Sequence, residues 1–296
     1  MQTPKIKTLA VTGSRNFADT QKAYALIAYI VKLHDCAQIC TGANQGAESL
    51  ATHFAQAKDI PFTTVSADWL QHGKAAEHEK QKTLAQKASI AIVFLAHDTT
   101  NKECASALQK LIRSRKDTYI YNEATQKTTL FTFEKYSNEL IEKLPNHLFL
   151  FGDNLLQSGT AGQAVIRHHE RAFGIPTKRK PTMEYSAFFS DKEDEKNAVR
   201  ERLQQFASKM EQERMCAVYP MGLIGTGLAK MPEYSPETFL ELHTSLAKKL
   251  GFPVEALESN LEFASVISAQ HPFQVRQLLA ELSQEVSQTT EQPTLF

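Results

Sequence analysis

Leu9-Ala10-Val11-Thr12-Gly13-Ser14-Arg15 is the stretch that decides the fold, because an apolar run of strand type ends there in a glycine turn. Two further strand-like runs also lead into turns that contain glycine. Ile39–Thr41 leads into Gly42-Ala43-Asn44-Gln45-Gly46-Ala47-Glu48, and Phe62–Val65 leads into Ala67-Asp68-Trp69-x-x-x-Gly73-Lys74-Ala75-Ala76. In a parallel sheet such turns line up at the carboxyl edge, where backbone N–H groups and helix N-termini bind anions. The three turns predict a site for a phosphate-bearing ligand; the alternative is that these glycines only make tight turns.

Apolar runs and helical patterns alternate along the first 125 residues or so. This alternation is typical of an α/β fold with a doubly wound parallel sheet. We expect strands at 8–12, 37–41, 62–65, 90–95 and 118–121, with helices at 20–33, 47–58, 75–87 and 102–114.

The charge balance limits the kinds of partner. The 33 Lys and Arg residues equal the 33 Asp and Glu residues, so no net charge draws the protein to DNA or to anionic membranes. The N-terminal residues lack the apolar core of a signal peptide, and no apolar run approaches the length of about 18 residues that a membrane span needs. The four cysteines form no C-x-x-C pair. We therefore expect a cytoplasmic protein that uses no metal, cofactor or membrane.

A second glycine-rich pattern begins after a polar connection. Strands predicted at 148–151 and 216–220 end in Gly152-Asp153-Asn154 and in a turn at 222–229, with helices predicted to end near His169 and to span 195–210. Two strands with such ends again predict a ligand site at a carboxyl edge. We expect a first domain at 1–125, a linker at 126–146, a second α/β domain at 147–282 and a flexible tail at 283–296.

The second domain carries its own candidate chemistry. Asp153 follows a buried strand, so it is a candidate acid/base carboxylate or ribose ligand, with Asn154 beside it as donor and acceptor; a helix or turn cap is the alternative. Lys178 and Arg179 are candidates to neutralise a phosphate, or belong to a solvated loop. The remaining candidates for phosphate contact here are Gly162, Gln163, Arg167, Gly225, Thr226 and Gly227.

The motifs at 11–15, 42–47 and 67–76 resemble the YspA-like branch of the SLOG superfamily. These Rossmann-like domains are related to the cytokinin-activating phosphoribohydrolases and to the DNA-loading protein DprA. The resemblance covers residues 7–122 and implies a nucleotide-type ligand at the carboxyl edge, with Arg15 pairing with a phosphate. Within these motifs the implied ligand contacts are Gly13, Ser14, Gly42, Ala43, Gly46, Glu48, Asp68 and Lys74.

One motif departs from that family. The phosphoribohydrolase relatives carry Pro-Gly-Gly-x-Gly-Thr-x-x-Glu after the fourth strand, whereas residues 94–103 keep only Thr100 and Glu103 in register. Each lost glycine adds a Cβ that holds a phosphate away from the backbone. The departure favours ligand binding over phosphoribohydrolase catalysis in this half, and it leaves Thr100 as a candidate ligand contact and Glu103 as a candidate catalytic residue.

The two remaining segments also show resemblances. Residues 147–240 are similar to an uncharacterised phage and bacterial domain, which supplies a boundary and no mechanism. The C-terminal peptide, Gln292-Pro293-Thr294-Leu295-Phe296, resembles the bacterial sliding-clamp-binding motif. That resemblance implies that Gln292 forms hydrogen bonds with a DNA sliding clamp and that Leu295 and Phe296 fill an apolar pocket.

Two functions of different classes follow. The first is an enzyme that hydrolyses an N-glycosidic bond of a nucleotide or nucleic acid, as a phosphoribohydrolase or a DNA glycosylase does, with Asp153 stabilising the sugar cation or activating water and Arg15 or Arg167 fixing the phosphate. The second is a non-catalytic nucleotide sensor or DNA-binding module that the tail recruits to the replication clamp.

Overall fold

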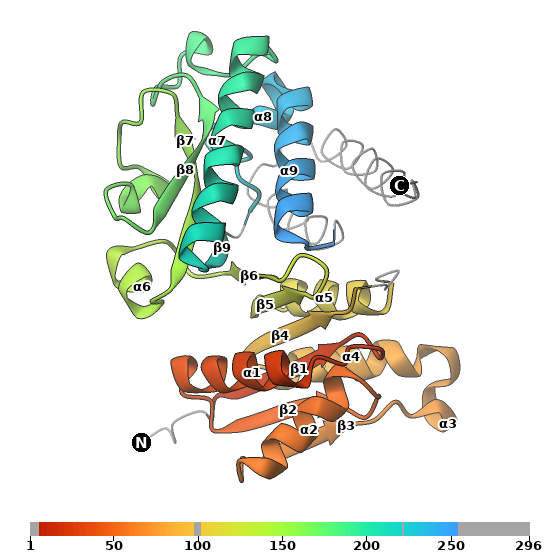
Figure 1. Ribbon diagram of the computed structural model, residues 1–296. Helices are drawn as coiled ribbons and strands as arrows, with labels where there is room; N and C mark the ends of the chain where they lie inside the picture. The colour runs from red at the N-terminus through yellow and green to blue at the C-terminus, as the bar shows by residue number, and fades with distance from the viewer. Residues whose placement is uncertain (1–5, 98–101, 221, 254–296) are drawn as a thin grey trace, which may run out of the picture. The chain divides into compact units, whose positions relative to one another are not determined.

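The computed structural model describes residues 6–97, 102–220 and 222–253 (Figure 1). The chain divides into two compact units, Met1–Phe131 (unit 1) and Thr132–Phe296 (unit 2). Each unit has its own parallel strands and its own covering helices. The α/β class predicted from the sequence is confirmed.

Unit 1 is built on a sheet in the order β3-β2-β1-β4-β5-β6. The first five strands are parallel, and β6 pairs antiparallel with β5. The chain therefore reverses its direction of travel across the sheet between β1 and β4, the point where open α/β sheets bind ligands. The strands are β1 (Thr8–Gly13), β2 (Gln38–Gly42), β3 (Phe62–Val65), β4 (Ile90–Leu95), β5 (Asp117–Asn122) and β6 (Lys127–Thr132).

Helices cover both faces of this sheet. The helix α1 contacts α2 and the helix α4 contacts α5. Right-handed crossovers in opposite directions put these two pairs on opposite faces. The helices are α1 (Thr20–His34), α2 (Ala47–Ala57), α3 (Trp69–His72), α4 (Ala76–Lys87) and α5 (Lys102–Arg113). The predicted elements agree with these bounds to within one or two residues.

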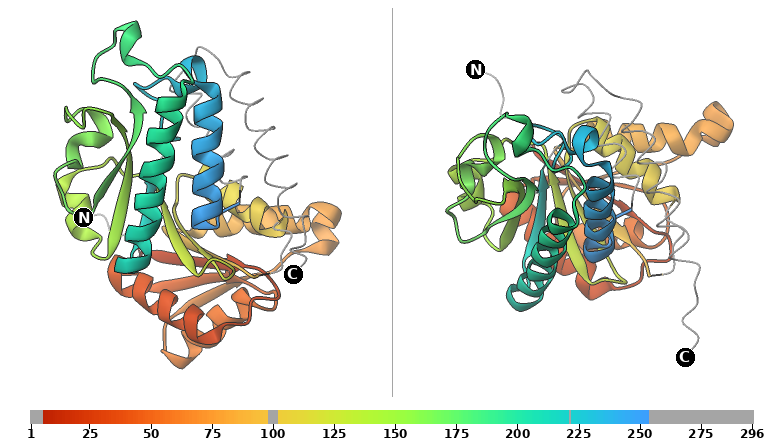
Figure 2. Two further views of the ribbon diagram at one scale, coloured as in Figure 1. Left: turned by 45° about the horizontal axis from the view of Figure 1, so that its top comes forward. Right: turned by 90° about the horizontal axis from the view of Figure 1, so that it is seen from above.

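Unit 2 holds three parallel strands in the order β9-β7-β8. The helices α7 and α9 lie side by side against this sheet (Figures 1 and 2). The elements are α6 (Asn138–Lys143), β7 (His147–Asn154), β8 (Ala172–Lys178), α7 (Glu193–Glu213), β9 (Cys216–Pro220), α8 (Met231–Tyr234) and α9 (Pro236–Leu250).

Unit 2 departs from the sequence expectations in three places. The strand β8 was not expected, because Gly174 and Pro176 disfavour a strand; an edge strand such as β8 tolerates proline. Instead of a helix that ends near His169, only a 3-10 helix forms at Gly162–Ile166. The segment 126–146 was expected as a linker with some strand character at 129–133 and a short helical pattern after Tyr136. It contains β6 and α6, and the division between the two units falls inside it.

Candidate functional site

The turns after β1, β2 and β4 pack directly against one another in unit 1. The amide of Ser14 donates to the carbonyl of Phe94 (2.8 Å), and the amide of Ala47 donates to the carbonyl of Ser14 (3.2 Å). A Cβ at Gly13 would overlap the Phe94 carbonyl, and one at Gly46, where φ is +71°, would overlap the Ser14 carbonyl. Both glycines therefore allow neighbouring backbone segments to pack closely against each other. The first two predicted turns meet at the carboxyl edge of the sheet.

Ser14 and Arg15 have different surroundings at this meeting point. Ser14 is buried, and its Oγ accepts a hydrogen bond from the amide of Ala96 (3.0 Å), which fastens the first turn to the end of β4. Arg15, the next residue, is exposed. The serine thus holds the turns together, and the arginine places a cation at their surface.

Glu48 is buried beneath the second turn. Its carboxylate accepts hydrogen bonds from the Thr12 hydroxyl (2.8 Å), the Asn44 amide (2.9 Å) and the Lys80 ammonium (3.1 Å). A Cβ at Gly42 would overlap this carboxylate. Glu48 therefore ties the second turn to β1 and α4 through internal contacts. Ala43 lies exposed on the same turn.

The third motif lies after β3, the edge strand of unit 1. Asp68 caps α3, and its side chain accepts from the amide of Gln71 (2.9 Å). Lys74 is exposed in a 3-10 helix at Gly73–Ala75. Trp69, the first residue of α3, is 59% exposed. No hydrogen bond or ion pair among the described residues joins Asp68 or Lys74 to the first two turns.

The motif after β4 is described only in part. Thr100 lies outside the described residues. Glu103 is the second residue of α5, the helix that follows β4. Gln292, Leu295 and Phe296 of the clamp-like peptide also lie outside the described residues.

Asp153 lies near the end of β7 in unit 2, where the pairing with β8 shifts register. One carboxylate oxygen, Oδ1, accepts from the Arg167 guanidinium in an ion pair and from the amide of Asn154 (2.6 Å). The other oxygen, Oδ2, has no hydrogen-bond partner among the described residues and lies where a Cβ at Gly174 would be. The carboxylate is thus anchored through Oδ1, while Oδ2 packs against Gly174.

Neighbouring polar residues close the loop after β7. The side chain of Asn154 donates to the carbonyl of Ser158 (2.8 Å). Gln163 accepts from the amide of Gly152 (3.3 Å), and Gly162 before it has a φ of +62°. These contacts hold the segment that carries Arg167 against the end of β7.

A cavity of about 190 Å³ opens beside Asp153. Arg202 of α7 lies in its wall, donates to the carbonyl of Gly174 (2.8 Å) and stacks over the ring of Phe173 at 4.0 Å. Burial lowers the pKa of Arg202, and the charge of Asp153 opposes that shift. Arg202 could not be predicted from the sequence, because nothing in the residue pattern of α7 distinguishes it from the other cations of that helix.

Lys178, the last residue of β8, is buried. Its ammonium donates to the carbonyls of Thr182 (2.6 Å) and Leu228 (3.0 Å), and it has no carboxylate partner among the described residues. Burial lowers the pKa of Lys178, and the positive charge of Lys230 lowers it further. Lys178 therefore links the loop after β8 to the turn after β9 and leaves a positive charge there.

Three further basic residues lie between positions 167 and 180, and two of them lie close to carboxylates: Arg171, Arg179 and Lys180. Arg179 forms an ion pair with the buried Glu195, and Arg171 lies 3.6 Å from Glu142. Lys180 is exposed, with no ion pair among the described residues. Lys180 therefore fits the alternative of a solvated loop, whereas Lys178 and Arg179 do not.

The turn after β9 contains two glycines with a positive φ. Gly222 and Gly225 have φ values of +75° and +93°. The amide and the hydroxyl of Thr226 both donate to the carbonyl of Leu223. The amide of the buried Gly225 has no acceptor within the described part of the chain, although most buried amides in proteins have one.

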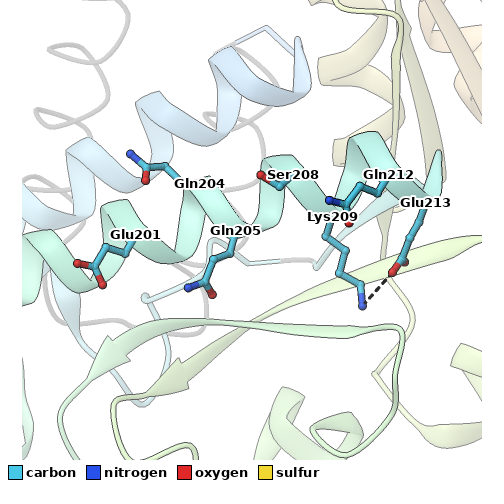
Figure 3. Close-up of a pocket in the computed structure, with 7 residues that line it drawn as sticks. All are labelled: Glu201, Gln204, Gln205, Ser208, Lys209, Gln212 and Glu213. Carbon is cyan, nitrogen blue, oxygen red and sulfur yellow. Dashed lines mark ion pairs between the residues drawn. The ribbon is translucent and has the colours of Figure 1, made fainter.

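A second hollow follows the outer face of α7 (Figure 3). Its volume is about 520 Å³, but one helix alone supplies its polar side chains, and two of them, Lys209 and Glu213, pair at 3.4 Å. Side chains from one helix cannot surround a ligand, so we assign no site there. The lining residues are Glu201, Gln204, Gln205, Ser208, Lys209, Gln212 and Glu213.

Two other kinds of feature are absent from the described residues. No group of three or more His, Cys, Asp or Glu side chains there could hold a metal ion. None of the helices in that part of the chain is both long and apolar enough to cross a lipid bilayer.

Comparison with known families follows the division into units. The model of the YspA, cpYpsA-related SLOG family matches residues 8–72, which span β1 to α3. The model of a family of unknown function, DUF7831, matches residues 131–245, which include β7, β8 and β9. No curated protein and no solved structure matched the chain. The chain thus joins a YspA-like domain of the SLOG family to a separate DUF7831 domain.

Proposed function

We propose that unit 1 binds the phosphate of a nucleotide-type ligand where the turn after β1 meets the N-terminus of α2. The observation that carries the proposal is the contact between these turns at Gly13, Ser14, Gly46 and Ala47. Family membership supports a nucleotide-related role.

The local chemistry suits a phosphate. The helix α2 has 11 residues, so its N-terminal amides and its dipole favour an anion. The exposed guanidinium of Arg15 adds a bidentate donor beside them. Because the protein has no net charge, the affinity must come from this local arrangement.

Calorimetric titration of the full chain with nucleoside monophosphates, NAD and ADP-ribose tests this site. Replacing Arg15 by Ala should weaken the best ligand by about 10- to 100-fold, because a hydrogen bond to a charged group is lost. Lys58→Ala, an exposed cation at the opposite end of α2, is the matched control and should bind as the wild type does. Equal affinity in Arg15→Ala and Lys58→Ala would overturn the proposal.

The second candidate is hydrolysis of an N-glycosidic bond at Asp153 in unit 2. It is supported by a carboxylate that is anchored by Arg167 and that lines a cavity of about 190 Å³. Ligand pockets usually measure about 300–1,000 Å³, so this cavity has room for a sugar but not for a whole nucleotide. A fixed carboxylate in that place could stabilise a sugar cation or activate water.

Mass spectrometry for released base tests the second candidate on nucleotides and on single- and double-stranded DNA. Release that is lost in Asp153→Asn and retained in Glu170→Gln, an exposed carboxylate nearby in sequence, is the expected result. Absence of release from every substrate, or unchanged release in Asp153→Asn, contradicts it.

Recruitment to a DNA sliding clamp is a further proposal, and it is supported by the sequence of the last five residues alone. A labelled peptide of residues 283–296 should bind a purified bacterial clamp. The same peptide with Leu295→Ala and Phe296→Ala should not. Equal binding of the two peptides would overturn this proposal.

A further inference from the structure

An ordered stack of aromatic rings stands at the carboxyl edge of unit 2. Phe188 pairs with the end of β8 through a bridge to Lys178, whose ammonium lies 4.4 Å from the Phe188 ring centre. Tyr234 stacks on Phe188 with ring centres 4.6 Å apart, and Tyr185 meets Tyr234 edge to face at 5.7 Å. Tyr185 therefore forms the outer end of a row of three aromatic rings that begins at Phe188.

The outer part of this stack is exposed. Tyr185 is 78% exposed, and Met183 and Leu228 beside Lys178 are 56% and 62% exposed. Large apolar side chains gathered on a surface usually mark a binding site. We call this surface, made of Met183, Tyr185, Leu228 and Tyr234, the aromatic platform.

The charge around the platform is positive. Lys178 at the end of β8, Lys180 in the loop after it and Lys230 just before α8 face two acidic residues nearby in the chain, Glu184 and Glu233. Glu233 lies 3.6 Å from Lys230, whereas Lys178 has no carboxylate partner among the described residues. A ligand with flat rings and negative charges complements this surface.

We propose that the aromatic platform binds an unpaired base of single-stranded nucleic acid, with Tyr185 stacking on the base and the turn at 222–230 contacting the adjacent phosphate. Stacking of one base on an aromatic side chain contributes about 1–3 kcal/mol. That energy alone corresponds to a Kd above about 1 mM, so a single nucleotide would bind weakly on an open surface. A strand adds phosphate contacts and further bases, and this favours a strand as the occupant. The proposal does not depend on the site at Arg15.

Fluorescence anisotropy of the full chain with a short labelled oligonucleotide tests the platform. The wild type should bind single-stranded DNA or RNA more tightly than the matching duplex, and Tyr185→Ala should weaken that binding by about 5- to 100-fold. Tyr185→Trp should retain it, because the ring face is kept. Leu70→Ala, a fully exposed apolar residue of unit 1, is the matched control. Lys180→Gln should reduce the slope of affinity against salt.

The outcomes are distinct. Unchanged binding in Arg15→Ala with loss in Tyr185→Ala supports the platform even if the proposal for unit 1 fails. The proposal is overturned if no oligonucleotide binds, if the duplex binds equally well, or if Leu70→Ala weakens binding as much as Tyr185→Ala does. Equal affinity for a mononucleotide and the oligonucleotide would also overturn it, since the occupant would then be a free nucleotide.

Discussion

The Asp153 carboxylate and the Arg167 guanidinium form a buried ion pair in which each side chain is only 7% exposed. The pair joins the end of β7 to the segment after the 3-10 helix at Gly162–Ile166. A buried pair of this kind contributes little by itself, but removing one partner leaves a buried charge without compensation. The pair therefore links the candidate chemistry of unit 2 to its stability.

Replacing Arg167 by Ala should lower the free energy of unfolding by about 3–5 kcal/mol, because Asp153 then stays buried as a lone charge. His168→Ala, an exposed neighbour, should change it by less than about 0.5 kcal/mol. Urea unfolding measures both. Equal stability of the two variants would contradict the buried ion pair.

Gly174→Ala should be strongly destabilising, because the added Cβ would overlap the Asp153 carboxylate. Part of the loss should be recovered in the Asp153→Ala background, where the overlapping oxygen is gone. A double-mutant cycle of unfolding free energies measures the coupling, which should exceed about 0.5 kcal/mol. Strict additivity would place Gly174 away from the carboxylate.

Glu48 and Lys80 form a buried ion pair in unit 1, as Asp153 and Arg167 do in unit 2. Both side chains are 1% exposed, and Lys80 also lies 3.0 Å from Glu77. Lys80→Met should cost about 3–5 kcal/mol of unfolding free energy, because Glu48 keeps its charge without this partner. The double variant Glu48→Gln with Lys80→Met should be more stable than Lys80→Met alone. A double variant that is less stable contradicts a buried charge at Glu48.

Two buried histidines predict how stability depends on pH. Burial lowers the pKa of His147 and of His243 to about 4. The Nε2–H of His243 donates to the carbonyl of Ile224 in the turn after β9, so the neutral ring fixes that turn. The unfolded histidine has a pKa of about 6.5, so the contribution is complete above that pH and is lost as the pH falls towards 4.

Each histidine should contribute up to about 3 kcal/mol over this range. Urea unfolding between about pH 7 and about pH 5 measures the slope. The slope should be smaller in His243→Phe than in the wild type. Wild-type stability that is constant between these pH values would contradict neutral buried histidines.

The first unit could be predicted closely because strand and helix patterns alternate along it, and because β1 and β2 end in glycine turns. Gly13 and Gly46 identified the carboxyl edge in the sequence, and the structure packs the turns that carry them together. The sequence could not show that Glu48 lies inside this arrangement, because its partners Thr12 and Lys80 are distant along the chain.

The second unit was harder to predict. Gly174 and Pro176 disfavour a strand, so β8 could not be predicted. The position of β8 beside β7 decides which residues surround Asp153. Tyr185 carried no sequence signal, because a lone aromatic residue in a polar loop has no periodicity. Its relation to Tyr234 and Lys178 depends on loops that only tertiary contacts bring together.

A crystal structure of the protein with its best-binding nucleotide tests the central claim most directly. We expect a phosphate within hydrogen-bonding distance of the Arg15 guanidinium and of the N-terminal amides of α2 that follow Ala47, whose own amide donates to Ser14. A nucleotide bound in unit 1 with its phosphate away from Arg15 and from the N-terminus of α2 would contradict it. So would a nucleotide bound in unit 2 only.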